Sequence, residues 1–424
     1  MKRFGISVSL AASLAVLATG CGKQAATPAP VGEQPDRPEP VTLSLYMPSV
    51  YPIQDYLINA VHKKYPHITL DPILRGPGKF PQDLVAAGTF PDLIYDSTPW
   101  YAPLLNMNLL YNMNDLVKSH KFDLSKLDPL AMDAIKMWGA NGELYALPIY
   151  RNFGVLYYNK DLFDKFGVAY PKDGMTWDDA AELARKLSRT DGGVEYRGMD
   201  ASGTYEGVSQ LSLPFVNASG KANLEAEGFV TAFNNLKTIY TIPGNKRGKK
   251  LTDFYKGTVA MQTFWNVLGN FEDMHKKGTP MNWDMVTLPT YKEAPGRSYQ
   301  VDSQNLSISS LSKHKELAFQ VIAYITSKEV QMEINKEGYI SSLVDPDVEK
   351  TFGANLQTLK GKNVQAIFRQ KSAPLYKVTE YDPIAQSFLE KALAEVINNG
   401  KDINTALRDA NELANLKIAE EMKK

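Results

Sequence analysis

The pattern of apolar and polar residues after residue 40 predicts three strands separated by two helices. Alternating or short apolar runs mark strands at 41–47, 68–73 and 91–96, and helical spacing marks 54–65 and 80–87. A strand–helix–strand–helix–strand order implies a parallel sheet with helical crossovers. Ligands on such sheets bind at the carboxyl ends of the strands, so the residues just after the strands are the first candidates for a binding site.

The rest of the chain continues to mix strands and helices. Further strands are expected at 143–148, 154–159, 258–261, 284–288 and 306–309, and helices at 176–187, 229–240 and 315–326. Two helices close the chain, one stopped by Gly400 and one capped by Asp402 that runs to Glu421. Thr176 and Asp179 have the spacing of a capping box.

The first 20 residues have the pattern of a secretory signal. A basic start precedes an uncharged apolar stretch over 4–18, which is too short for a comfortable membrane span. This stretch ends in LATGC at 17–21, which resembles a bacterial lipobox in which Cys21 becomes the first residue and carries lipid. An ordinary secretory signal with an incidental cysteine is the alternative. The Pro-, Ala- and Gln-rich segment 21–40 then predicts a lipid-anchored flexible tether.

The composition excludes several classes of protein. A chain of 424 residues is too long for one core and suits two or three domains. Lys plus Arg and Asp plus Glu both number 47, and a net charge of zero argues against nucleic acid as a partner. A single cysteine precludes an intramolecular disulfide and any zinc site built from two or more cysteines. Beyond the signal, no uncharged apolar run is long enough to span a membrane.

Five segments of the chain together carry the motifs of one family, in matching order. They are PIY (148–150) with LYYNKDLF (156–163); FGV (166–168) leading to TWDD (176–179); FYKGTVAM (254–261); SKHKELAF (312–319) with TSKE (326–329); and Gly400-Lys401 with Ala406-Leu407. Behind the lipobox, they resemble family 1 extracellular solute-binding proteins, the carbohydrate-binding lipoproteins of ATP-binding-cassette importers. The resemblance covers roughly residues 41–421.

This resemblance implies an α/β fold of the periplasmic-binding-protein type, with two lobes, a hinge and a ligand cleft between the lobes. Lobe one would comprise 41–148 plus 298–336, and lobe two 149–297 plus 337–424. The implied protein is a monomeric binding subunit without enzymatic activity or cofactor. It would be lipid-anchored on the outer face of the cytoplasmic membrane and deliver a sugar or oligosaccharide to the membrane permease of the importer.

A carbohydrate site needs flat aromatic side chains against the apolar faces of the sugar and planar hydrogen-bonding groups for its hydroxyls. The strand ends offer both kinds of group: Tyr51 follows the first predicted strand, and Asp96 and Trp100 follow the third. Each has a structural alternative. Tyr51 suits an exposed surface aromatic, Asp96 a helix cap and Trp100 core packing.

The expected crossover between the lobes offers four more candidates. Tyr150 and Arg151 follow the strand at 143–148, and Arg151 either bonds ligand hydroxyls or pairs with an acidic residue of the opposite lobe. Asp302 and Gln304 precede the strand at 306–309 and would approach the ligand from lobe one.

The resemblance adds two aromatic candidates. Trp265 follows the segment 257–261, after which the family often places an aromatic platform, although core packing would also explain it. Tyr339 lies in the loop 338–342, where the family commonly completes its cleft.

The sequence contains no GxGxxG, phosphate-loop, GxSxG or HExxH motif, and its five histidines form no metal-binding pair. No catalytic residue, metal site or cofactor is therefore predicted. Two alternatives remain open. The same fold could bind a polyamine, peptide or metal chelate, which an acidic cage with few amides would favour. An extracellular enzyme acting on polysaccharides would instead be identified by turnover of an oligosaccharide.

Overall fold

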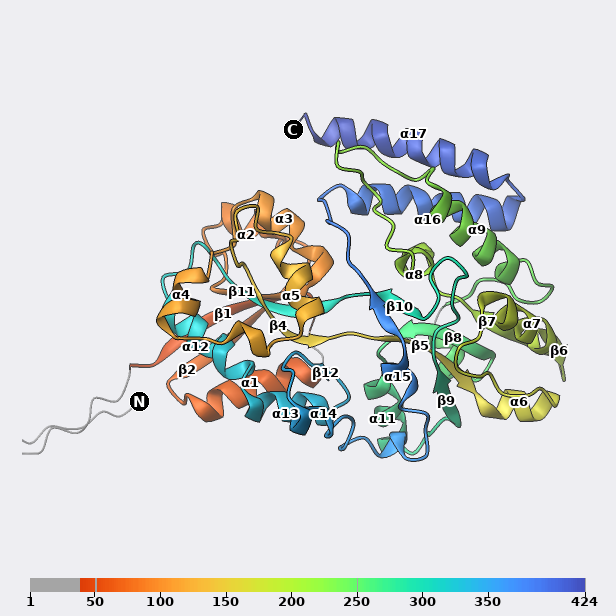
Figure 1. Cartoon of the computed structure of the whole chain (residues 1–424), viewed down its shortest axis with the longest axis horizontal. Helices are drawn as coiled ribbons and strands as arrows, with labels where there is room; N and C mark the ends of the chain where they lie inside the picture. The colour runs from red at the N-terminus through yellow and green to blue at the C-terminus, as the bar shows by residue number, and fades with distance from the viewer. Residues whose placement is uncertain (1–38, 50–51, 250, 424) are drawn as a thin grey trace, which may run out of the picture. The chain divides into compact units, whose positions relative to one another are not determined.

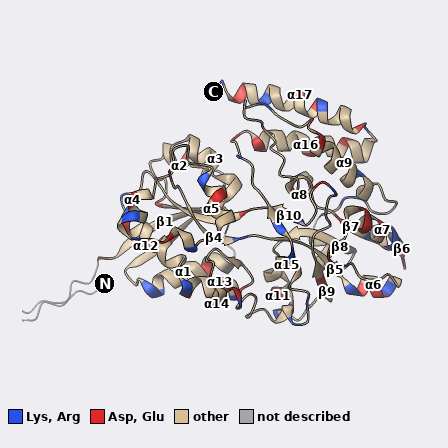
Figure 2. Cartoon of the chain, in the orientation of Figure 1, with Lys and Arg blue, Asp and Glu red and all other residues tan. Residues whose placement is uncertain are grey.

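The computed structural model describes residues 39–49, 52–249 and 251–423, and the chain from Pro40 onward forms one compact unit. The expected signal, Cys21 and all but the last two residues of the tether lie outside the described residues, as does Tyr51. Among the helices described, none is long and apolar enough to cross a membrane. Basic and acidic positions are interspersed along the ribbon, for example on the last helix (Figure 2).

A six-stranded mixed sheet organises the first part of the chain (Figure 1). Its order is β12-β4-β11-β3-β1-β2, with β1 at Val41–Met47, β2 at Ile68–Leu74, β3 at Leu93–Ser97, β4 at Leu147–Arg151, β11 at Ser303–Ile308 and β12 at Ile340–Ser341. The expected parallel pairing is confirmed for β1 with β2 and β3. The other strands are antiparallel to their neighbours, because β11 and β12 re-enter the sheet from the later chain.

A five-stranded sheet organises the second part of the chain. Its order is β6-β7-β8-β5-β9, with β5 at Gly154–Asn159, β6 at Arg189–Asp191, β7 at Val194–Asp200, β8 at Val259–Trp265 and β9 at Trp283–Val286. The interior strand β5, between β8 and β9, is buried on both faces: Leu156 and Tyr158 pack in one apolar cluster, and Val155 and Tyr157 in another. Its continuous apolar sequence follows from this double burial.

Helices cover both sheets. With the first sheet go α1 at Pro52–Lys64, α2 at Pro81–Ala86, α3 at Ala102–Asn106, α4 at Asn114–Ser119, α5 at Pro129–Lys136, α12 at Lys315–Ile325, α13 at Lys328–Lys336, α14 at Pro346–Glu349 and the 3-10 helices η1 at Thr98–Trp100 and η2 at Leu124–Lys126. With the second go α6 at Lys160–Phe166, α7 at Trp177–Leu187, α8 at Thr204–Ser209, α9 at Glu227–Tyr240, α10 at Leu251–Tyr255, α11 at Leu268–Lys276, α15 at Ala366–Arg369, α16 at Asp382–Asn399, α17 at Ile403–Glu421 and the 3-10 helix η3 at Gln357–Leu359.

Local sequence signals set several helix ends as expected. The Asp179 amide donates to the Thr176 hydroxyl at 3.2 Å, and the Thr176 amide donates to the Asp179 carboxylate at 2.8 Å, which is the capping box before α7. Gly400 ends α16 with a left-handed φ of 69°, a conformation that glycine adopts without a side-chain clash.

Two expected strands have different bounds. Residues 143–146 are not in a strand, because the Leu144 amide bonds the Asn112 side chain and the Leu144 carbonyl accepts from Met113. The strand expected at 258–261 continues to Trp265, because its pairing with β5 extends to Gly154.

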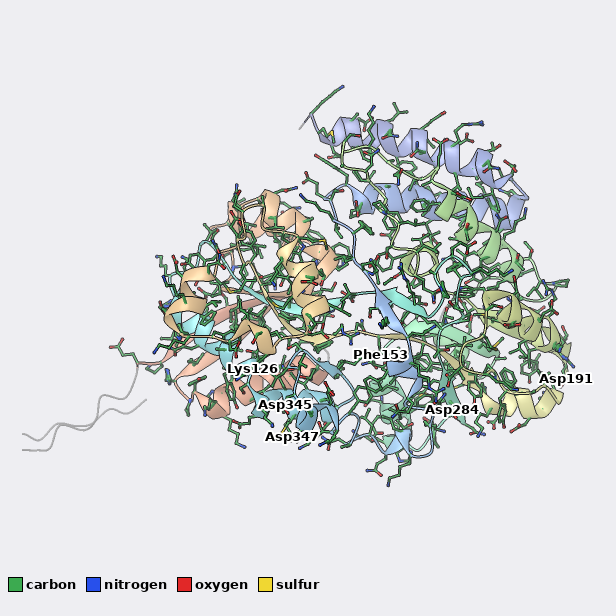
Figure 3. The ribbon with its side chains drawn as sticks, viewed as in Figure 1. Lys126, Phe153, Asp191, Asp284, Asp345 and Asp347 are labelled. Atoms are coloured by element: carbon green, nitrogen blue, oxygen red, sulfur yellow. The ribbon has the colours of Figure 1, made fainter. Side chains whose placement is uncertain are left out.

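Two adjacent segments carry the chain between the parts that hold the two sheets, and the chain passes between these parts a third time after α14. Asn152 and Phe153 join β4 to β5, and Phe153 is labelled at this passage in Figure 3. The second passage, Val301–Asp302, joins β11 to β10 at Arg297–Gln300, which pairs with β13 at Lys371–Ala373 in a sheet of two strands. The Asn152 amide donates to the Asp302 carbonyl at 2.8 Å, so the two passages are hydrogen-bonded to each other.

Candidate functional site

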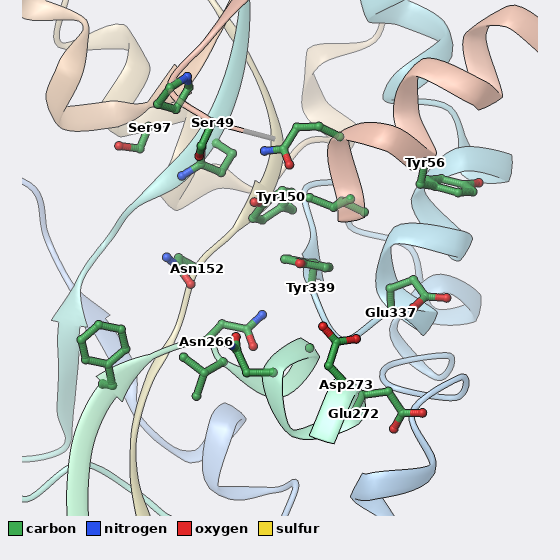
Figure 4. A pocket seen from close by; sticks show the side chains of 18 of the residues that line it. Ser49, Tyr56, Ser97, Tyr150, Asn152, Asn266, Glu272, Asp273, Glu337 and Tyr339 are labelled. Carbon is green, nitrogen blue, oxygen red and sulfur yellow. The ribbon is translucent and has the colours of Figure 1, made fainter. Parts of the chain in front are cut away.

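A cavity of about 720 Å³ lies between the ends of strands from the two sheets. Its walls come from residues after β1 and β2, from β3, β4 and β11, and from the end of β8 with α11 (Figure 4). The lining residues are Pro48, Ser49, Ile53, Gln54, Tyr56, Arg75, Asp96, Ser97, Trp100, Tyr150, Asn152, Leu251, Phe264, Asn266, Val267, Gly269, Asn270, Glu272, Asp273, Lys276, Gln304, Glu337, Tyr339 and Leu356.

Arg75, Asp96 and Trp100 form one wall of the cavity. An Arg75 guanidinium nitrogen lies 2.9 Å from the Asp96 carboxylate, and the guanidinium carbon lies 4.9 Å from the centre of the Trp100 ring. Burial raises the pKa of Asp96 to about 6, and the charge of Arg75 opposes this rise. Trp100 is 49% exposed, which is high for a tryptophan and leaves its ring available to a ligand.

Tyr150 and Tyr339 form an aromatic corner whose ring centres are 4.7 Å apart. The Tyr150 hydroxyl accepts a hydrogen bond of 3.1 Å from Tyr95, and only 7% of Tyr150 is exposed. Tyr150 therefore belongs mainly to the core of the first sheet and presents an edge to the cavity.

Asn266 holds the opposite wall in place. Its side-chain amide donates to the Gly338 carbonyl at 2.9 Å, and its side-chain oxygen accepts from the Leu268 amide at 3.0 Å. The first bond fixes the end of β8 to the turn before β12, and the second fixes the start of α11. Asn270 and Asp273 then project from α11 as exposed polar groups of the lining.

The lining bears more carboxylates than cations. Arg75 is paired with Asp96, and Lys276 lies 3.8 Å from Glu272, which also accepts from the Thr358 amide at 3.0 Å. The Glu337 carboxylate accepts a hydrogen bond from Asn355. Among the described residues, no group of three or more potential metal ligands gathers here or elsewhere.

Five residues selected from the sequence line this cavity: Asp96, Trp100, Tyr150, Gln304 and Tyr339. Gln304 reaches it from β11, where it pairs with Ser97 on one side and Tyr150 on the other.

Three other candidates lie in the structure outside this lining. Arg151 pairs with Asp128 at 3.0 Å and donates to the Ser372 hydroxyl at 3.1 Å; Asp128 caps α5, which packs beside the same sheet as β4, so this pair does not join opposite lobes. Trp265 ends β8 with its ring centre 4.7 Å from that of Tyr299. Asp302 is buried beside Asn152 at the passage between the sheets.

Sequence reasoning missed several lining residues. Arg75 directly follows the second strand, and the carboxyl end of a parallel strand is where a ligand-binding side chain is expected. Asn152 and Asn266 gave no comparable signal, because their place at the cavity depends on how the two sheets meet.

The sequence of the chain is similar to those of known binding proteins. A family model described as bacterial extracellular solute-binding protein matches residues 47–332, about two thirds of the chain. The arabinooligosaccharide-binding protein of Bacillus subtilis is 25% identical over 293 residues, which cover 63% of this chain and 65% of that protein. The mannitol-binding protein of Pseudomonas aeruginosa is 31% identical over 126 residues, covering 30% of this chain and 25% of that protein. The matches thus span less than two thirds of these relatives.

Solved structures agree with the fold over almost the whole chain. An ABC substrate-binding protein from Listeria monocytogenes in complex with cycloalternan superposes with a TM-score of 0.73 at 19% identity, covering 90% of this chain and all of that one. The two-lobe fold expected from the sequence is confirmed.

Proposed function

Because the chain belongs to the bacterial extracellular solute-binding protein family, we propose that it captures a sugar or oligosaccharide between its two lobes and delivers it to an importer. The resemblance inferred from the sequence motifs is confirmed by this membership. The observation that carries the proposal is the pairing, in one cavity, of an exposed tryptophan with planar amides from both walls. Trp100 offers a flat apolar face, and Asn152, Gln304 and Asn270 offer donors and acceptors for hydroxyls.

The lobes in this proposal follow the sequence boundaries, 41–148 plus 298–336 for lobe one and 149–297 plus 337–424 for lobe two. Because β4 of the first sheet runs to Arg151 and β12 pairs with it, extending lobe one to residue 151 and adding Ile340–Ser341 to it is favoured. The passages at 152–153 and 301–302 would then be the hinge about which the lobes close on the ligand.

We further propose that Cys21 carries lipid and holds the protein on the outer face of the cytoplasmic membrane. The support is the LATGC sequence at 17–21, followed by a segment without large apolar side chains. The partners in this proposal are the sugar and the permease subunits of an ATP-binding-cassette importer. The protein would act as a monomer and without catalysis.

A cationic solute is the second candidate. The carboxylates of Asp96, Glu272, Asp273 and Glu337 outnumber the two cations of the lining, Arg75 and Lys276, which favours a ligand with positive charge. The amides from both walls favour a neutral sugar, and the screen below includes both classes.

The test is a thermal-shift screen followed by titration calorimetry. A ligand that binds only the folded state raises the melting temperature by mass action. The panel contains mannobiose, mannotriose, maltose, arabinotriose and mannitol, with spermidine as the cationic solute. Binding of a sugar that Trp100→Ala weakens would support the proposal. Binding of spermidine alone would replace it with the cationic alternative, and turnover of an oligosaccharide would replace it with an enzymatic function.

Tyr51, Arg151, Trp265 and Asp302 remain predicted ligand contacts, each tested by the affinity of its alanine variant for the sugar found in the screen.

A further inference from the structure

Asp302 is a buried carboxyl group at the passage between the two sheets. It lies between β10 and β11 and is 9% exposed. Its Oδ2 atom lies 3.4 Å from the side-chain nitrogen of Asn152, which is long for a hydrogen bond. Among the described residues no well-formed hydrogen bond reaches its Oδ1 atom, although the Thr98 backbone amide is close enough to favour the charged carboxylate. A charged oxygen that is buried without a hydrogen-bond donor costs free energy, so this site favours the protonated form of Asp302.

Asn152 connects this carboxyl group to the ligand cavity. Its side chain lines the cavity, while its backbone amide donates to the Asp302 carbonyl at 2.8 Å. Its side-chain oxygen accepts from the Phe153 amide at 3.2 Å. An asparagine amide has two N–H donors and two acceptor lone pairs, so one of each is left for a ligand. The direction in which this free donor and acceptor of Asn152 point depends on the hydrogen bond to Asp302.

The groups around Asp302 disfavour its charge. Asp96 on β3, Tyr150 on β4 and Tyr205 on α8 interact with it electrostatically, and none of these is a cation. Arg75 and Arg151 are paired with Asp96 and Asp128. Burial raises the pKa of Asp302 to about 7 and the charge of Asp96 raises it further, while hydrogen bonds from the Asn152 side chain and the Thr98 backbone amide lower it.

We propose that Asp302 is a positioning residue: its ionised carboxylate fixes the Asn152 amide at the hinge side of the cavity, and protonation of Asp302 lets that amide turn. A charged acceptor holds an N–H donor more strongly than a neutral one, so the ionised form tightens the 3.4 Å contact. The protonated fraction of the carboxyl falls as the pH rises through its raised pKa. Proton occupancy at the hinge thereby controls a ligand-facing amide. The consequence for ligand capture rests on the proposed function, but the placement of Asn152 does not.

The experiment follows the side-chain amide signal of Asn152 by nuclear magnetic resonance in the ligand-free full chain between pH 5 and 8.5. The signal is assigned by its loss in Asn152→Ala. We expect it to move with a midpoint near pH 7 in the wild type, to stay in place in Asp302→Asn and to titrate again, with a changed midpoint, in Asp302→Glu. The shift alone reports the nearby charge, so turning of the amide is read from nuclear Overhauser effects between its side-chain protons and neighbouring residues, which should change with the same midpoint. An aspartate that titrates without positioning Asn152 would move the shift and leave these effects unchanged.

Asn245 supplies the matched control, because its side-chain amide is fully buried and bonded to the Met199 and Ile239 carbonyls. Its signal should not move over this range. The proposal is overturned if the Asn152 signal stays fixed in the wild type, or if its titration survives in Asp302→Asn; loss of that surviving titration in Asp96→Asn would assign it to Asp96. The experiment needs no ligand. A sugar screen that finds no binding would therefore not affect the titration of Asn152, and a failure of this titration would not affect the proposed sugar binding.

Discussion

The guanidinium carbon of Arg75 lies 4.9 Å from the centre of the Trp100 ring, so the tryptophan that the cavity exposes is supported from one side by a cation. The same guanidinium is held by Asp96 at 2.9 Å. One face of the indole is thus fixed by the protein, and the cation–π contact orients the ring. The Trp100 side chain is still 49% exposed, and this exposed surface can contact a ligand.

Trp100→Ala should weaken binding of the sugar found in the screen by about 2 kcal/mol, or roughly thirtyfold, because a flat apolar surface is lost. The melting temperature of the ligand-free protein should change little, since the ring is not core. Titration calorimetry measures the affinity. Phe368→Ala is the matched control, since Phe368 is 47% exposed but lies outside the cavity lining. Equal affinity of wild type and Trp100→Ala would exclude a stacking role.

Arg75→Met should lower the free energy of unfolding by about 1–3 kcal/mol at pH 8, because it leaves the buried Asp96 carboxylate unpaired. Arg75 lowers the pKa of Asp96, so the pKa rises above about 6 in the variant. The deficit should therefore disappear as the pH falls towards 4, where Asp96 is protonated in both proteins. Urea unfolding of both proteins at pH 8 and pH 4 measures this difference in the free energy of unfolding.

The control for that prediction is Arg185→Met, which removes an exposed pair with Glu182 on α7 and should cost at most about 0.5 kcal/mol. A loss of stability in Arg75→Met that is equal at pH 8 and pH 4 would show that the variant acts through packing and not through the charge of Asp96.

Asp302→Asn should stabilise the protein at pH 8. The pKa of Asp302 is about 7 when folded against an ordinary value of 3.8, so the folded state binds more protons than the unfolded chain between these values. Wild-type stability therefore falls as the pH rises through this window. Asparagine does not titrate, and the variant should be more stable by up to about 4 kcal/mol at pH 8, at about 1.4 kcal/mol per pKa unit. Unfolding curves that differ equally at pH 4 and pH 8 would contradict this assignment.

Closure of the lobes should reduce the radius of gyration when the sugar binds. Small-angle X-ray scattering with and without saturating ligand measures the change. The wild type in the presence of a sugar that fails in the thermal-shift screen is the control. An unchanged radius at saturation would indicate a rigid site and would weaken the importer function.

Cys21→Ala should release the protein from membranes, because one lipid-modified cysteine is the proposed anchor. Fractionation of cells that lack the permease separates lipid anchoring from docking to the transporter. Retention of Cys21→Ala on such membranes would leave an ordinary secretory signal, or another attachment, as the explanation.

Local signals predicted much of the fold, and contacts between distant segments decided the rest. The strand at 41–47, the capping box at Thr176 and the stop at Gly400 depend on neighbouring residues, and the structure has them as expected. The side chains of Asn152 and Asn266 reach the cavity only because the two sheets meet there. The parallel sheet became mixed for the same reason, since strands from after residue 300 complete it. The family resemblance, and not periodicity, supplied the two-lobe arrangement.

The six-stranded sheet also sets an order of events during synthesis. Its strand β11 begins at Ser303 and lies between β3 and β4, both of which are made before residue 152. The whole five-stranded sheet is encoded between these two points. Pairing β11 with β3 closes a loop of some two hundred residues, and such long-range pairing is slow. The first sheet is thus incomplete, with the edges of β3 and β4 open, until the second has emerged. The proposed signal, which is made first, would act on a chain whose first sheet is still incomplete.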